Sequence, residues 1–223
     1  MTEKYLIAGL GNPGAQYEST RHNIGFTVLE ALSRRLGIVG KRERRFDAIV
    51  GVGRAPGGQS VILAQPLTFM NLSGQAIIKI MQYYHVPPER LLVIYDEAAL
   101  PFGRIRFRPS GSDAGQKGMR SIIQCLGGCS EFPRLRIGIG SPPPPMAMVD
   151  FVLGRFSLEE REGLPKVMDT ALDGLEEWLN VGTEAVMARY NGLRILEDSA
   201  NELSDNVGTD NRPDDISNPS SQP

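Results

Sequence analysis

Cysteine and histidine are scarce in this sequence of 223 residues, with two of each. Cys125 and Cys129 lie four residues apart near an expected helix end, without a further cysteine or a nearby histidine. They therefore form neither a set of metal ligands nor a designed disulfide, and we expect reduced thiols in a cytosolic compartment. Imidazole chemistry near neutral pH has only two candidates, His22 and His85.

Long apolar runs are also missing, and none is long enough to span a bilayer. The first expected strand begins within four residues of Met1, with no signal or transit segment before it. A chain of this length with 41% hydrophobic residues suits one compact domain with a sizeable core. We therefore expect a cytoplasmic protein that does not bind membranes.

The net charge is small, at −2, but it is unevenly distributed. Residues 196–223 contain seven acids and one base, so this segment carries −6 and residues 1–195 carry +4. The segment is rich in Asn, Ser, Asp and Pro, so we expect a single domain at 1–195 and a disordered acidic tail at 196–223. A mildly basic body suits a polyanionic partner, although so small an excess does not identify one.

The chain is organised around residues 6–26. A short apolar run followed by the sequence GLGNPG predicts a buried strand that ends in a glycine-rich loop. This loop presents Asn12, and the start of the following helix presents His22 and Asn23. Ligands of open α/β sheets bind beyond the carboxyl ends of the strands, so these residues are site candidates. A bond within the first helical turn is the alternative for His22, and a capping role is the usual one for His85 at its helix end.

Two later strands also end in polar residues. Asn71 follows the strand expected at 60–64, and Asp96 follows the continuous apolar run at 91–95. A helix N-cap is the structural alternative for Asn71, and a turn is the alternative for Asp96. If these strands are parallel neighbours of the first, all the candidates meet on one rim.

The alternation of strands and helices predicts an α/β fold. The expected elements are strands at 5–8, 46–52, 60–64, 91–95 and 103–108, and helices at 24–36, after 71, from 157 and at 183–190. Ser157 and Glu160 form a capping box, Pro165 should kink or restart the helix that follows, and Trp178 belongs to its core face. We expect a single domain with a twisted, mixed, largely parallel β-sheet flanked by helices.

Arginines alternate with apolar residues in two of these segments. Arg104, Arg106 and Arg108 share one face of an expected strand, and Arg134 and Arg136 repeat the pattern. Such a comb of guanidinium groups suits the reading of phosphates. An edge strand guarded by charge is the alternative.

A series of motifs then identifies a family. In order, they are GLGNPG at 9–14, Tyr17, TRHNIGF at 20–26, QPLTFMNLSG at 65–74, Asp96-Glu97 with Leu100-Pro101, FPRLRIGIG at 132–140 and DFVL at 150–153. Together they resemble the bacterial-type peptidyl-tRNA hydrolases, from about residue 3 to about residue 191. Several of these motifs are long enough to be specific.

The resemblance implies an enzyme that hydrolyses the ester between a peptide, or an N-blocked amino acid, and the 3′-terminal ribose of peptidyl-tRNA. It implies that His22 activates water as general base and that Asp96 holds its other ring nitrogen. The sequence has no nucleophile-elbow motif, which favours direct attack by water. No metal or cofactor is expected, and the protein is expected to act as a monomer.

Further residues are implied in substrate binding. Asn12 and Asn71 offer amides to the peptide main chain and to a developing oxyanion, and Asn23 orients the same groups. Met70 offers an adaptable apolar wall, although a core methionine is equally ordinary. Tyr17 can stack on the terminal adenine.

The resemblance places basic residues that meet the tRNA backbone at Arg106, Arg108 and Arg136. The sequence departs from the family at Gln116-Lys117, where many members have His-Asn. Lysine only donates hydrogen bonds, so Lys117 is a candidate contact to a substrate phosphate or carbonyl.

Two other functions fit parts of the sequence. A dinucleotide-binding enzyme is suggested by the glycine spacing at 9–14, but Pro13 delays the helix and Arg34 and Arg35 stand where an acid is needed about 20 residues on. A non-catalytic RNA-binding homologue of the same fold remains open because of the altered residues 116–117. Turnover of N-blocked aminoacyl-tRNA separates this homologue from the enzyme.

Overall fold

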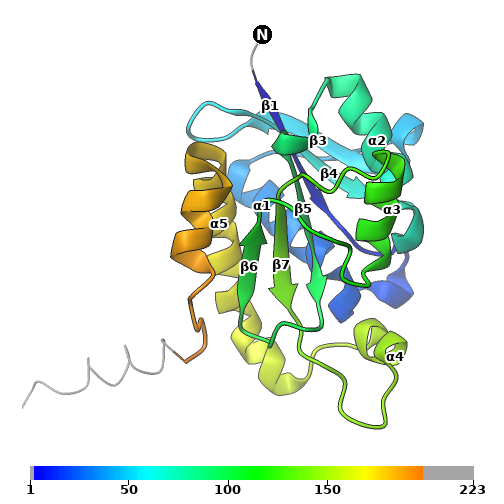
Figure 1. Ribbon diagram of the computed structural model, residues 1–223, viewed down its shortest axis with the longest axis vertical. Coiled ribbons are helices and arrows are strands. Elements are labelled where there is room, and N and C mark those ends of the chain that lie inside the picture. The colour runs from blue at the N-terminus through cyan, green and yellow to red at the C-terminus, as the bar shows by residue number, and fades with distance from the viewer. Residues whose placement is uncertain (1–2, 198–223) are drawn as a thin grey trace, which may run out of the picture.

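The structure, a computed structural model, describes residues 3–197 and is built on one seven-stranded sheet (Figure 1). The strands are β1 (Lys4–Gly9), β2 (Lys41–Glu43), β3 (Ala48–Arg54), β4 (Ser60–Pro66), β5 (Leu91–Glu97), β6 (Ile105–Arg108) and β7 (Arg134–Gly138), in the order β2-β3-β4-β1-β5-β7-β6. β1 is parallel to β4 and β5, and β5 is parallel to β7, whereas the outer pairs are antiparallel. The predicted single-domain α/β fold with a mixed sheet is confirmed.

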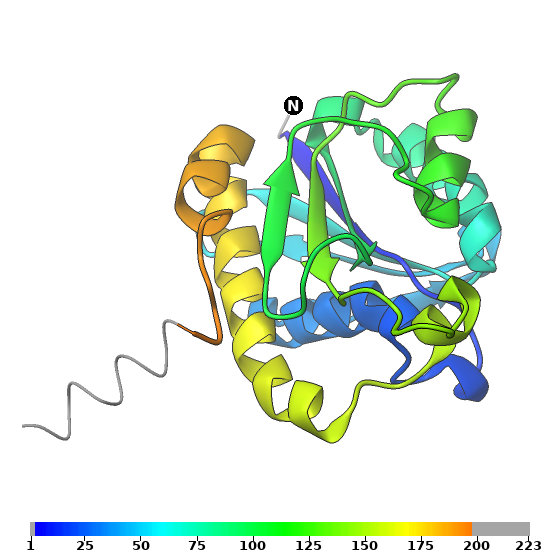
Figure 2. The same cartoon turned by 60° about the horizontal axis from the view of Figure 1, so that its bottom comes forward.

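Helices cover both faces of this sheet (Figure 2). They are α1 (Ile24–Leu36), α2 (Ser73–Tyr84), α3 (Lys117–Cys125), α4 (Met148–Leu153) and α5 (Leu158–Tyr190), with short 3₁₀ helices η1 (Ala15–Tyr17), η2 (Arg21–Asn23), η3 (Arg44–Phe46), η4 (Met70–Leu72) and η5 (Pro88–Arg90). α1 and α5 pack on one face, and α2 and α3 pack on the other. The expected stop of the first helix at Gly37 is confirmed, because Gly37 adopts the left-handed conformation, with φ 65°.

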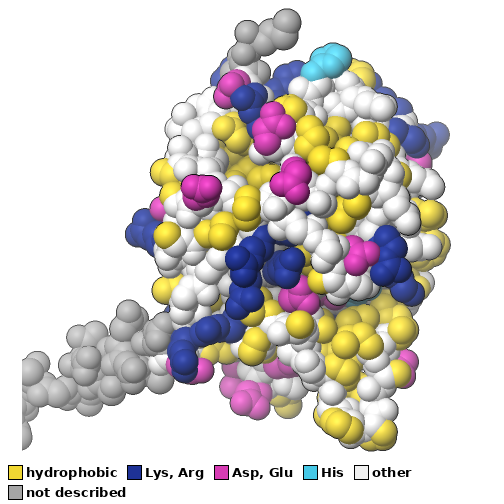
Figure 3. All heavy atoms as spheres, in the orientation of Figure 1, with side chains coloured by type: hydrophobic (Ala, Val, Ile, Leu, Met, Phe, Trp, Pro, Cys, Tyr) yellow, Lys and Arg dark blue, Asp and Glu magenta, His cyan; other side chains and the backbone are white. Residues whose placement is uncertain are grey.

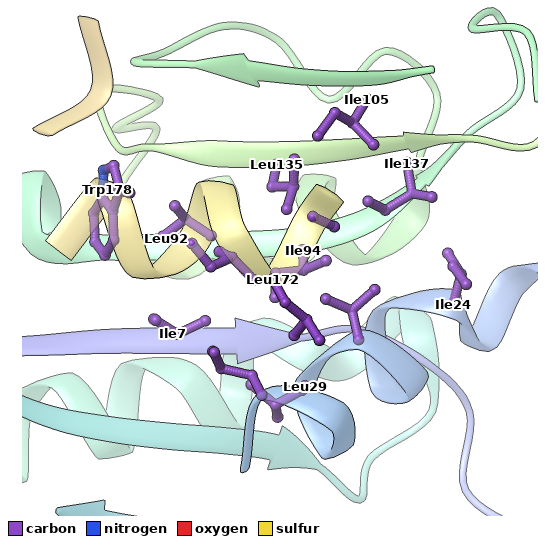
Figure 4. Packing of buried hydrophobic residues seen from close by; sticks show 14 of the residues in the cluster. Ile7, Ile24, Leu29, Leu92, Ile94, Ile105, Leu135, Ile137, Leu172 and Trp178 are labelled. Atoms are coloured by element: carbon purple, nitrogen blue, oxygen red, sulfur yellow. The ribbon is translucent and has the colours of Figure 1, made fainter. Parts of the chain in front are cut away.

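The face covered by α1 and α5 carries the larger apolar cluster (Figure 4). Ile7 of β1 and Leu92 of β5 join Leu29 of α1 and Leu172 of α5 in it. Trp178 of α5 is buried in the same cluster, so its predicted core role is confirmed. Every residue of β5 is buried, as a continuous apolar run covered on both faces requires.

The long helix α5 differs from the expectation. Its capping box is formed, because Ser157 Oγ accepts from the Glu160 N–H and a Glu160 carboxylate oxygen accepts from the Ser157 N–H. Pro165 lies inside the helix and does not restart it, whereas non-helical backbone angles occur at Gly182, with φ 80°, in agreement with the separate helix expected at 183–190. Pro165 is exposed, and a proline at this position removes the helical hydrogen bond to the Arg161 carbonyl.

The acidic tail expected at 196–223 lies outside the described residues, except for its first two. Ile195 is buried and Leu196 packs against the core, so the described chain stays attached to the domain up to this point. Cys125 and Cys129 are free thiols, as expected. Among residues 3–197, no helix combines the length and apolar character that crossing a membrane requires.

Candidate active site

The carboxyl ends of β1, β4 and β5 lie side by side, because the three strands are parallel neighbours. The segments that leave them carry Asn12, Asn71 and Asp96 to one cavity of about 540 Å³, and η2 brings His22 to the same place. The structure therefore brings together the four residues that the sequence placed on one rim.

A close contact between two glycines positions the histidine. A Cβ atom on Gly9, at the end of β1, would lie 2.2 Å from the carbonyl oxygen of Gly25. A Cβ atom on Gly25 would lie 2.4 Å from the carbonyl oxygen of Ile94 in β5. Only glycine fits at either position, so the start of α1 packs backbone against backbone on two strand ends. This contact brings η2, and His22 with it, to the end of β5.

His22 and Asp96 form a hydrogen-bonded pair. His22 Nδ1 lies 2.8 Å from Asp96 Oδ2, and the two side chains are 13% and 4% exposed, respectively. An ionised carboxylate only accepts hydrogen bonds, so Nδ1 carries the proton and the neutral ring keeps its lone pair on Nε2. The pair thus presents a base in the cavity whose tautomer and orientation are fixed.

Asn12 and Asn23 form one connected unit. Asn23 Oδ1 accepts from the Asn12 N–H at 2.8 Å, and Asn23 Nδ2 donates to the Asn12 carbonyl at 3.0 Å. Asn12 Oδ1 accepts from the Met70 N–H at 2.8 Å. Asn23 therefore holds the backbone of Asn12, and Asn12 keeps its Nδ2 group as the donor for a substrate.

Asn71 does not cap α2, which was its structural alternative. It lies within η4, is exposed and lines the cavity, and α2 begins two residues later at Ser73 without a side-chain cap. Lys117, the first residue of α3, is exposed and lines the same cavity. Tyr17 lies in η1, half-buried and outside the cavity lining, where its carbonyl accepts from the Thr20 hydroxyl at 2.7 Å.

Apolar side chains form two walls of the cavity. Phe69 and Met70 line one part of it, and Met148, Val149, Val152 and Leu153 of α4 line another. Met148, Val149 and Leu153 are exposed, and apolar surface gathers over α4 in Figure 3. Helix α4 was not predicted from the sequence, because its six residues are too few for a helical period to stand out. The motif DFVL at 150–153 was the only signal for it.

The arginine comb lies on the sheet face opposite the α5 cluster. Arg106 of β6 is paired in register with Arg136 of β7, and Arg108 is paired with Arg134. Arg106, Arg108 and Arg136 are partly exposed, and basic side chains gather over β6 and β7 in Figure 3. Arg136 also pairs with Glu97 at 3.3 Å, next to the cavity. The predicted alternation is therefore present on a partly exposed surface.

Arg134 has a different environment from the other arginines. Its side chain is fully buried, and its guanidinium donates to the carbonyls of Gly111, Ser112 and Ser130 at 2.7, 3.1 and 2.7 Å. Burial lowers the pKa of Arg134 below its ordinary value. Arg134 thus holds the loop at 110–116 that leads to α3, and alternation alone gave no sign of this burial.

An imidazole oriented by a carboxylate, beside carboxamide donors in a cleft at strand ends, defines the class of general-base hydrolases. Among residues 3–197, no group of three or more His, Cys, Asp or Glu side chains is arranged to hold a metal ion.

Comparison with known proteins then gives the family. The family model for peptidyl-tRNA hydrolase matches residues 6–199. The peptidyl-tRNA hydrolase of Gloeobacter violaceus is 46% identical over 189 residues, which are 85% of this chain and 94% of that protein. The peptidyl-tRNA hydrolase of Chloroflexus aggregans is 49% identical over 191 residues, 85% of this chain and 100% of that protein. The crystal structure of peptidyl-tRNA hydrolase from Acinetobacter baumannii superposes with a TM-score of 0.75 at 35% identity, covering 86% of this chain and 96% of that one. The chain belongs to the peptidyl-tRNA hydrolase family, and the predicted resemblance is confirmed.

Proposed function

We propose that this protein hydrolyses the ester bond between a peptide, or an N-blocked amino acid, and the 3′-terminal ribose of peptidyl-tRNA, which frees the tRNA for reuse. The observation that carries the proposal is the 2.8 Å contact between His22 Nδ1 and Asp96 Oδ2 inside the cavity. Relatives named peptidyl-tRNA hydrolase that match 85% of the chain support it. They also disfavour the non-catalytic homologue.

His22 and Asp96 are the proposed catalytic residues. His22 Nε2 takes a proton from a water molecule as the water oxygen bonds to the ester carbonyl carbon, and Asp96 stabilises the imidazolium that forms. The carbon–oxygen bond to the ribose then breaks, and the imidazolium returns its proton to the leaving ribose oxygen. General-base catalysis of this kind contributes on the order of 10²–10⁴ in rate.

Carboxamides and the lysine are the proposed polar substrate contacts. Asn12 and Asn71 donate from their Nδ2 groups to the oxyanion that forms on the ester carbonyl, or to peptide carbonyls. Asn23 contributes by holding Asn12, to whose two backbone groups it is bonded. Lys117 donates to a phosphate or carbonyl of the substrate near the ester.

The apolar walls suit a variable peptide. Met70 is unbranched and adaptable, and exposed apolar side chains of α4 line the same cavity. Such walls bind peptide side chains through buried area rather than through directed hydrogen bonds, so they accept many sequences. Tyr17 lies outside this lining, and its proposed partner is the terminal adenine, on which it would stack.

The tRNA body is the proposed partner of the arginine comb. Arg106, Arg108 and Arg136 share one partly exposed sheet face, and Arg136 is linked through Glu97 to the cavity lining. A duplex whose 3′ end enters the cavity can therefore lay its phosphates on this face. We also propose that the protein acts as a monomer, because a single copy carries the whole cavity. We propose the cytoplasm as its location.

Turnover of N-acetyl-aminoacyl-tRNA tests the proposal. The wild-type protein should release N-acetyl amino acid catalytically, and His22→Ala should lose most of the turnover, on the order of 10²-fold or more, while tRNA affinity is retained. His85→Ala, which removes the other histidine at the left-handed cap of α2, is the matched control and should keep the wild-type rate. An unchanged rate for His22→Ala would rule out its role. Tight tRNA binding by the wild type without release would support the non-catalytic homologue.

A further inference from the structure

The side chain of Gln116 connects helix α3 to the catalytic pair. Gln116 directly precedes α3 and is 9% exposed. Its Oε1 accepts from the Met119 N–H at 2.8 Å, which caps the helix. Its Nε2 lies 3.3 Å from Asp96 Oδ1 and 3.1 Å from Met70 Sδ. The same carboxamide therefore serves a helix end and the carboxylate.

The orientation of this carboxamide follows from its partners. The Met119 N–H can only donate, so the amide oxygen must face it. The amide NH₂ then has to face Asp96, whose ionised carboxylate can only accept. A flipped amide would place donor against donor at the helix and oxygen against oxygen at Asp96. The helix end thus directs a donor at the carboxylate.

Asp96 is held through both of its oxygens. Oδ2 accepts from His22 at 2.8 Å and Oδ1 accepts from Gln116 at 3.3 Å, so rotation of the carboxylate breaks one of the two hydrogen bonds. Its side chain is 4% exposed, and within the described part of the chain the ion pair of Asp96 is the one with His22. A buried carboxylate needs hydrogen-bond donors at both oxygens, because burying an unpaired polar atom is costly.

We propose that Gln116 is a positioning residue for the hydrolytic reaction: it holds Asp96 in the rotamer that orients His22. The inference rests on the proposed function of the His22–Asp96 pair. The competing role is a structural one, in which Gln116 only caps α3.

The charged groups around the pair define what else can affect its protonation. Those that line the cavity are His22 from η2, Asp96 and Glu97 from β5, and Lys117 from α3. Glu97 is paired with Arg136, and the lining residues from η4 and α4 carry no charge. All of these groups are unchanged in a variant at position 116, so a shifted pH profile in such a variant reports on the new side chain beside Asp96.

Gln116→Glu separates the two roles. A glutamate keeps an oxygen that accepts from the Met119 N–H, so the cap of α3 should be preserved. It replaces the donor by a second carboxylate beside Asp96, which favours retention of a proton at the site. We expect kcat to fall between about 10- and 100-fold with little change in KM, because a misplaced catalytic group costs rate rather than binding. The acid limb of the kcat/KM profile should move to higher pH.

Gln124→Glu is the matched control, because it makes the same change at an exposed position of α3. It should leave kcat and the pH profile unchanged. A Gln116→Glu protein with the wild-type kcat and pH profile would overturn the positioning role and leave Gln116 as a helix cap.

A second measurement does not depend on turnover. The chain contains only two histidines, so the ring signals of His22 and His85 can be assigned by NMR and followed against pH. In Gln116→Glu the pH at which the His22 signals shift should rise, while that of exposed His85 should not. An unchanged His22 signal would overturn the inference even in an active enzyme. A wild-type protein that fails to cleave peptidyl-tRNA would instead contradict the proposed function, and the NMR comparison would still test the link from Gln116 to Asp96.

Discussion

The carboxamide of Asn191 hydrogen-bonds both main-chain groups of Phe107. Asn191 Oδ1 accepts from the Phe107 N–H at 2.7 Å, and Asn191 Nδ2 donates to the Phe107 carbonyl at 3.1 Å. Phe107 belongs to β6, the last strand of the sheet order, so its outer backbone groups have no neighbouring strand. One side chain thus takes the place of a strand at the edge that carries Arg106 and Arg108.

Asn191→Ala should therefore destabilise the protein. It leaves the N–H and C=O of Phe107 without partners, which costs about 1–3 kcal/mol for a buried pair. Urea unfolding followed by circular dichroism measures this loss. Asn180→Ala provides a control, because Asn180 is exposed and bonds to the half-buried Gln59 and to its own helix. Equal stabilities of the two variants would contradict the edge-pairing role of Asn191.

Asn23→Ala should lower both stability and activity. It removes the partners of the two backbone groups of Asn12, which are buried, and costs about 2–3 kcal/mol. Asn12 then shifts relative to the ester, so kcat should fall by about tenfold or more. Steady-state kinetics well below the melting temperature separates the two effects. If the variant is destabilised but keeps the wild-type kcat, Asn23 supports the fold and not the reaction.

The arginine comb should contribute to tRNA affinity in a salt-dependent manner. Replacing Arg106 and Arg108 together by Gln should weaken binding of deacylated tRNA and reduce the slope of log K against log salt by about 2, one for each phosphate that is no longer neutralised. Arg54→Gln tests whether any loss of positive charge has this effect, because Arg54 of β3 pairs with Ser60 at the amino end of β4, away from the cavity. Fluorescence titrations at several salt concentrations give both slopes. An unchanged slope in the double variant would show that Arg106 and Arg108 do not contact the tRNA.

Ionisation of Tyr190 should lower the stability of the protein at alkaline pH. Burial and the hydrogen bond that its hydroxyl donates to Glu177, at 2.8 Å, raise the pKa of Tyr190 to about 12 from 10.0. The folded state therefore holds this proton more tightly than the unfolded state does. The hydroxyl contributes fully below pH 10, and its contribution is lost as the pH rises toward 12. Tyr190→Phe should be less stable than the wild type by about 1 kcal/mol at pH 7. The difference should shrink above pH 10 in chemical unfolding, and a constant difference would contradict the assignment.

Much of the site could be predicted because it depends on local sequence. Asn12, Asn71 and Asp96 each follow a recognisable strand, and parallel neighbouring strands place their carboxyl ends on one rim. The sequence shows that residues 9 and 25 are glycines, but it does not show that they contact each other. It joins segments that only the folded chain brings together.

The features that were missed depend on tertiary contacts. Gln116 was recognised only as a departure from the family, because its carboxamide is bonded to the helix it caps and to Asp96, which lies in a strand 20 residues away. Arg134 matched the alternation of its neighbours, and the loop that buries it lies more than 20 residues earlier in the chain.

The backbone contact between Gly9 and Gly25 has a consequence for how this protein can change. No side chain stands between Gly25 and the ends of β1 and β5, so main-chain geometry at this contact sets how closely the start of α1, and the imidazole beside it, approaches the strand ends. Substitutions elsewhere in the interior can alter how firmly the domain holds together while the reacting ring stays where it is. Substitutions in the interior can therefore accumulate without moving the imidazole of His22.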